Sequence, residues 1–84
     1  MLTAAQMKAA RALVGMEQKM LAARSGVSLP TIQRMETSNG VVRGVIDTLM
    51  KVMEALEAAG VEFINEGGIS SGGGRGVRLR RVSN

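Results

Sequence analysis

The sequence contains no cysteine and no histidine, and Phe63 is its single aromatic residue. Without cysteine the chain can form neither a disulfide nor a thiolate metal site. Without histidine it lacks the commonest general base and the commonest metal ligand. No convergent set of carboxylates takes their place, so we expect no enzymatic activity, no metal and no cofactor.

Long hydrophobic runs are also missing. No apolar stretch approaches the roughly 18–20 residues that span a bilayer, and the N-terminus lacks the basic-then-apolar order of a secretory signal. We therefore expect a soluble, cytoplasmic protein that does not associate with membranes. Hydrophobic residues still make up 45% of the 84 residues, and the net charge is +4. The chain can thus fold as one small domain with an aliphatic core, and its charge favours an anionic partner.

Apolar residues at helical spacing predict two longer helices, over residues 4–14 and 45–59. The first begins with a capping box formed by Thr3 and Gln6 and ends at Gly15. The second has apolar residues spaced for one buried face, namely Ile46, Leu49, Met50, Met53 and Leu56. These two helices are expected to enclose the segment between them.

Two short helices, over residues 17–24 and 29–37, are expected between the longer ones. Gly26 allows the positive φ of a tight turn between them, and Ser28 is a suitable N-cap for the second. Ile32, together with Met35 three residues later, predicts the buried side of that second helix. Such a pair matches a helix-turn-helix, whose second helix enters the major groove of DNA. An ordinary helical hairpin is the alternative.

The composition changes after Gly60. Residues 61–64 and 77–82 have the pattern of strands, and residues 66–76 between them hold six of the eleven glycines, as a flexible loop would. Because an isolated two-stranded hairpin is marginally stable in water, it needs a helix beneath it or a second copy alongside. We therefore predict a mainly α fold. A four-helix, repressor-like helix-turn-helix domain (1–60) precedes a C-terminal β-hairpin or strand pair (61–84).

Three runs of residues resemble the xenobiotic-response-element, or Cro/C1-type, helix-turn-helix family. They are QKMLA at 18–22, SGVS at 25–28 and TIQRME at 31–36. The resemblance extends over residues 4–60, and the tail is similar to that of short regulators of this family from alpha-proteobacteria. It implies a DNA-binding domain of four helices.

The resemblance also implies roles for individual residues. The base-contacting residues would be Gln33, Arg34, Leu29, Pro30 and Thr31. The phosphate-contacting residues would be Gln18, Ser28, Lys19, Asn39 and Arg43. Arginine suits O6 and N7 of guanine, and glutamine suits N6 and N7 of adenine. Arg11 and Glu36 would form a structural pair that ties the first helix to the end of the third. For Ser28 the alternative is an N-cap alone, and for the charged residues it is simple solvation.

The arginines at 78, 80 and 81 allow two interpretations, a phosphate-binding stripe or charges that protect an edge strand from aggregation. We favour the second. The apolar residues of the two strands are expected to form the contact between subunits, namely Val61, Phe63, Ile64, Val77 and Leu79.

Together these features predict a sequence-specific transcriptional regulator that binds double-stranded DNA. We expect a repressor that acts as a homodimer on an inverted repeat, with no small-molecule ligand. Two alternatives stay open. One is an antitoxin or anti-activator that mainly binds another protein, and the other is a DNA-bending accessory factor for recombination.

Overall fold

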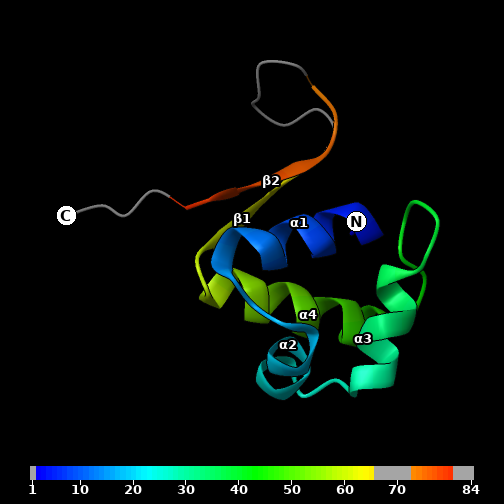
Figure 1. The fold of residues 1–84 in the computed structure, drawn as a ribbon. Coiled ribbons are helices and arrows are strands. Elements are labelled where there is room, and N and C mark those ends of the chain that lie inside the picture. Colours follow the sequence, from blue (N-terminus) through cyan, green and yellow to red (C-terminus); the bar gives the residue numbers. More distant parts are fainter. Residues whose placement is uncertain (1, 66–72, 81–84) are drawn as a thin grey trace.

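The computed structural model describes residues 2–65 and 73–80, which form four helices followed by a two-stranded sheet (Figure 1). The elements are α1 (Ala4–Val14), α2 (Gln18–Ser25), α3 (Leu29–Glu36), α4 (Ile46–Ala58), β1 (Val61–Ile64) and β2 (Gly76–Leu79). The expected helix ends lie within one residue of the observed ones. The mainly α fold with a C-terminal strand pair is confirmed.

Local side-chain chemistry sets both ends of α1. The backbone N–H of Gln6 donates to Thr3 Oγ1 at 3.0 Å, and the backbone N–H of Thr3 donates to Gln6 Oε1 at 2.9 Å. This is the predicted capping box, which satisfies two N–H groups that have no partner within the helix. At the other end, Gly15 adopts a left-handed conformation with φ of 63° and closes the helix.

The core is aliphatic and draws on every helix and on β1. Its largest fully buried side chains are Leu2, Met7, Leu21, Ile32, Leu56, Val42, Val52 and Val61. One part of the prediction for α4 is wrong, because Ile46 and Met50 are exposed while Val52 is buried. The stripe that faces the core consists of Leu49, Val52 and Leu56, spaced three and four residues apart. Ile46 and Met50, four residues apart, lie on another side of α4, which remains in solvent.

The strand pair packs on α1 and α4. β1 and β2 are antiparallel, with Phe63 opposite Val77 and Glu62 opposite Arg78. The second strand begins at Gly76, one residue earlier than expected. Residues 66–72 of the predicted loop and residues 81–82 of the predicted strand lie outside the described residues. Figure 1 shows the strand pair across α1, on the far side of the domain from α3.

Gln6 links the strand pair to α1. Its side-chain amide donates to the carbonyl oxygens of Ile64, at 3.2 Å, and of Gly76, at 3.0 Å. These carbonyls stand at the end of the strand pair where β1 finishes and β2 starts. Gln6 is buried, so one side chain completes the cap of α1 and also holds both strands.

Two tail arginines make contacts within the chain. Arg78 forms an ion pair with Glu62, with Nε 3.1 Å from Oε2. Arg80 Nη2 donates to the carbonyl oxygen of Glu57 at 2.8 Å, near the C-terminal end of α4. The last turn of α4 contains no basic residue of its own, so Arg80 supplies the positive charge that a helix C-terminus favours. These contacts give both arginines a role within the fold.

Candidate nucleic-acid interface

The two sides of α3 differ sharply in polarity. Ile32 and Met35 are buried, whereas Gln33 and Arg34 point into solvent. Pro30 and Thr37 are also exposed, and Leu29 and Thr31 are half-buried. The five predicted base-contacting residues therefore share one short helix, and three of them, Pro30, Gln33 and Arg34, are exposed.

The turn before α3 determines how that helix is presented. Gly26 has φ of 72°, and its N–H donates to the carbonyl oxygen of Ala22 at 3.0 Å. The next residue, Val27, is buried between the helices. Ser28 then caps α3. Its Oγ accepts from the N–H of Thr31 at 3.4 Å and donates to Thr31 Oγ1 at 2.8 Å. The predicted N-cap role of Ser28 is thus present.

A buried carboxylate fixes the other end of α3. Arg11 Nε and Nη2 lie 2.6 Å from Glu36 Oε2 and Oε1, respectively, in a two-pronged ion pair. Glu36 is buried, and Arg11 Nη1 also donates to the carbonyl oxygen of Met16 at 3.1 Å. The hydrogen bond with Glu36 raises the pKa of the Arg11 guanidinium against the opposing effect of burial. The structure therefore brings together the two residues expected to form a structural pair.

Gln18 joins the same carboxylate. Its Nε2 donates to Glu36 Oε1 at 3.1 Å, so Glu36 connects α1, the start of α2 and the end of α3. The sequence offers no sign of this contact, because the two residues are separated by 18 positions and by a turn. The side chain of Gln18 is thus turned inward. A phosphate contact at this residue would use the backbone N–H groups of the first turn of α2, where Glu17 makes no side-chain cap.

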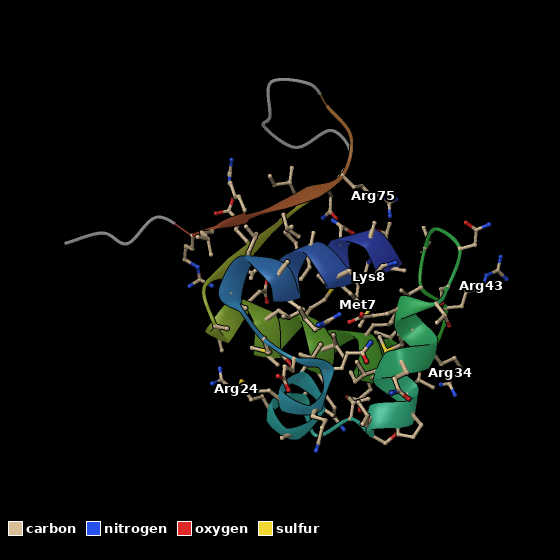
Figure 2. The ribbon with its side chains drawn as sticks, viewed as in Figure 1. Met7, Lys8, Arg24, Arg34, Arg43 and Arg75 are labelled. Carbon is tan, nitrogen blue, oxygen red and sulfur yellow. The ribbon has the colours of Figure 1, made fainter. Side chains whose placement is uncertain are left out.

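Positive charge gathers beside α3. Figure 2 shows Arg34 and Arg43 on the same side of the molecule, away from Arg24 and Arg75. A hollow of about 220 Å³ joins them, lined by α3, by residues 43–45 and by the first turn of α4. Within residues 2–65 and 73–80, neither guanidinium forms an ion pair. Both are therefore available to a bound anion.

The remaining predicted phosphate contacts, Lys19 and Asn39, are exposed. Lys19 lies in the first turn of α2, and Asn39 lies in the loop between α3 and α4. Lys19 precedes the start of α3 by ten residues, and Asn39 follows its end by three. The predicted phosphate contacts thus come from α2, from the cap of α3 and from the loop that follows it.

The residues predicted to join two subunits lie elsewhere. Val61 is fully buried in the core of its own chain, and Phe63, Ile64 and Val77 are half-buried. Only Leu79 is largely accessible, with 55% of its surface exposed. The structure does not place these residues beside α3, since the strand pair packs on α1 and α4.

A family model described as helix-turn-helix matches residues 7–42. The matched range runs from the first buried methionine of α1 through α2 and α3 to Val42, and it includes every predicted DNA-contacting residue except Arg43. No curated protein matches the chain. None of the helices in the described part of the chain is both long and apolar enough to cross a bilayer.

Proposed function

We propose that this chain, a DNA-binding transcription regulator whose residues 7–42 form a Cro/C1-type helix-turn-helix, acts as a homodimeric repressor on an inverted repeat. The observation that carries the proposal is the outer face of α3. Gln33 and Arg34 are free on that face, while buried contacts at Ile32 and Glu36 hold the opposite side of the helix in place. Rigid presentation of two long polar side chains suits the reading of base edges.

In this proposal α3 lies in the major groove. Arg34 donates to O6 and N7 of a guanine, and Gln33 pairs with N6 and N7 of an adenine, each contributing about 1–3 kcal/mol of discrimination. Leu29 and Pro30 can pack against a thymine methyl group. Thr31, whose hydroxyl already bonds with Ser28, is placed to reach a base edge or a neighbouring phosphate.

Phosphate contacts would orient α3 on the duplex. Lys19, Asn39 and Arg43 supply exposed donors around the helix, and the first turn of α2 supplies backbone N–H groups. Such contacts carry no sequence information, but they determine the register of the protein on DNA. They also make affinity depend on salt, since each neutralised phosphate releases a counterion.

The homodimer follows from the small reach of one copy. With eight residues, α3 spans only a few base pairs. Two copies related by a two-fold axis read two half-sites of an inverted repeat, separated by roughly 34 Å or a multiple of it. Occupation of such a site within a promoter is sufficient to repress transcription.

Selection of bound sites from random double-stranded DNA tests the proposal. We expect the wild-type chain to enrich an inverted repeat, and Arg34→Ala to lose preference at one position in each half-site, at a cost of about 1–3 kcal/mol per contact. Arg24→Ala is the matched control, because Arg24 is exposed on α2 and lies away from Arg34 (Figure 2). Tight binding to a protein without any enriched DNA site would contradict the proposal and favour an antitoxin or anti-activator.

A further inference from the structure

Residues at the start of α1 pair with the loop that follows α3. The backbone N–H of Val42 donates to the carbonyl oxygen of Leu2 at 2.8 Å. The backbone N–H of Ala4 donates to the carbonyl oxygen of Gly40 at 3.1 Å. The two segments run antiparallel, and we call the contact that these two hydrogen bonds make the N-terminal pairing.

The N-terminal side of this contact is fixed independently of the loop. The side chain of Leu2 is fully buried in the core. The backbone N–H and the hydroxyl of Thr3 both donate to Gln6 Oε1, at 2.9 and 3.3 Å. Ala4 is buried and is the first residue of α1. The loop therefore pairs with a segment whose position is already set by the core and by α1.

The N-terminal pairing also sets which side chains of the loop face outward. Val42 is buried, whereas its neighbours Val41 and Arg43 are exposed, as expected where the side chains of an extended segment alternate. A shift of the pairing by one residue would turn Arg43 toward the core and Val42 toward solvent. The hydrogen bond from Val42 to Leu2 thus keeps Arg43 on the outer side.

The two predicted phosphate contacts of the loop lie on either side of the paired residues. Asn39 directly precedes Gly40, and Arg43 directly follows Val42. The loop, residues 37–45, connects α3 with α4, and a loop held only at its ends would have many conformations to lose. Because the pairing orders the loop during folding, this entropy does not have to be lost when DNA binds.

α1 holds the recognition helix as well as the loop. In its C-terminal half, Arg11 pairs with Glu36 at the end of α3, and at its N-terminal end the N-terminal pairing holds the loop. A base contact by Arg34 and a phosphate contact by Arg43 must fit one duplex at the same time. A single helix that supports both elements fixes the distance between them, as a binding site requires.

We propose that the N-terminal pairing positions Arg43 for contact with a DNA phosphate, so that residues 2–4 serve DNA binding through the loop. The inference rests on the proposed function, in which Arg43 contacts phosphate. Residues 2–4 and Arg43 all lie outside residues 7–42, the range that the family model matches. The alternative is a pairing that only stabilises the fold, and the two differ in whether its loss acts through Arg43.

Ala4→Pro removes one hydrogen bond of the pairing, because proline lacks the N–H that donates to Gly40. Ala4 is the first residue of α1, a position that favours proline. Thr3 before it is already extended, with φ of −104° and ψ of 156°, as a residue before proline should be. Ala5→Pro is the matched control, since Ala5 is exposed and Pro30 already occupies the second position of α3.

A second variant disturbs the pairing from the side of the loop. Gly40 has φ of 81°, which alanine rarely adopts, and an added Cβ meets nothing within 4 Å. Gly40→Ala therefore strains the loop without a clash, and it decides the question if Ala4→Pro does not fold. Gly74→Ala is its control in the tail, because Gly74 has φ of 77° and similarly open surroundings among the described residues.

Affinity for the selected DNA site, measured over a range of salt concentrations, is the readout. We expect Ala4→Pro and Gly40→Ala to bind about three- to tenfold more weakly, as Arg43→Ala does. Both should lower the slope of log affinity against log salt toward that of Arg43→Ala, with the same selected half-site and an unchanged circular dichroism spectrum. In the Arg43→Ala background, neither variant should weaken binding further. The two controls should bind as the wild type does.

The double variants distinguish positioning from stability. Equal weakening with and without Arg43 would show that the pairing acts on the fold alone, and it would overturn the inference. Wild-type affinity in folded Ala4→Pro and Gly40→Ala proteins, or in Arg43→Ala itself, would overturn it as well. A wild-type chain that enriches no DNA site would instead refute the proposed function.

Discussion

The recognition helix α3 and the strand pair both pack on α1, but different chemistry holds each of them. At the C-terminal half of α1, Arg11 holds α3 through a buried ion pair with Glu36. At the N-terminal end, Gln6 holds β1 and β2 through a neutral amide that donates to two carbonyl groups. A charged pair thus holds α3 on α1, and neutral hydrogen bonds hold the strand pair.

The arginines of the two regions also differ, in whether they contact other groups of the chain. Arg34 and Arg43, beside α3, form no ion pair within the described residues. Arg78 and Arg80, in the tail, are bound to Glu62 and to the end of α4. Arg34 and Arg43 are thus available to a bound anion beside α3, whereas Arg78 and Arg80 are engaged within the fold. Equal numbers of arginines in two segments of a sequence can therefore serve separate purposes.

The largest expected effect comes from removing the charge that holds α3. Glu36→Ala leaves the partly buried Arg11 without its partner, and we expect the free energy of unfolding to fall by about 3 kcal/mol. Urea denaturation of the variant measures the loss. Glu62→Ala is the control, because its pair with Arg78 is exposed and should contribute about 0–1 kcal/mol.

The Glu36→Ala variant also tests whether Glu36 acts only on stability or also on the choice of DNA sequence. Any folded Glu36→Ala protein should select the same half-site sequence as the wild type, since Glu36 is buried beneath α3. A changed half-site would show that Glu36 influences base reading directly. Because the hydrogen bond with Glu36 raises the pKa of Arg11, the stability that this pair contributes is present at neutral pH and is lost only in strong alkali.

A smaller effect should follow from changing the amide that holds the strands. Gln6→Glu keeps the oxygen that accepts from Thr3 but removes the donors to Ile64 and Gly76. Two carbonyl groups then lose their partner, at a cost of about 1–3 kcal/mol. Amide hydrogen exchange should speed up in β1 and β2 while α2 and α3 keep their protection. An equal loss of protection in all elements would contradict the separate role of Gln6.

The smallest expected effect concerns DNA affinity and salt. Arg43→Ala should lower affinity for all sequences alike and reduce the slope of log affinity against log salt by about one. Arg78→Ala removes the same charge from the tail and should leave the slope unchanged, since Arg78 is engaged with Glu62. Equal slopes for the two variants would show that the tail also contacts phosphate.

Much of the fold could be predicted from signals that act within a few residues. The capping box at Thr3, the left-handed Gly15 and Gly26, and the cap at Ser28 each involve backbone groups close in the chain. Together with the apolar spacing that predicted α4, these signals placed all four helices within one residue of their observed ends. The polar face of α3 was equally predictable, since Ile32 and Met35 leave only one side for Gln33 and Arg34.

Other features depend on partners far away in the sequence. Gln6 meets the carbonyl groups of residues 58 and 70 positions later, and Gln18 meets a carboxylate 18 positions later. No local pattern encodes such contacts, because they exist only once the helices have packed. The tail arginines are a further case, since a sequence shows their charge but not the carbonyl or carboxylate that receives it.

The sequence by itself determined the helix-turn-helix, its ends and its polar face, because hydrogen bonds and capping act locally along the chain. Only the tertiary structure decided which apolar stripe of α4 is buried. Residues Ile46, Leu49, Met50 and Val52 are all apolar at helical spacing, and the sequence alone could not choose among them. Packing against the neighbouring elements buries Leu49 and Val52. Ile46 and Met50, four residues apart, lie on a side of α4 that stays in solvent.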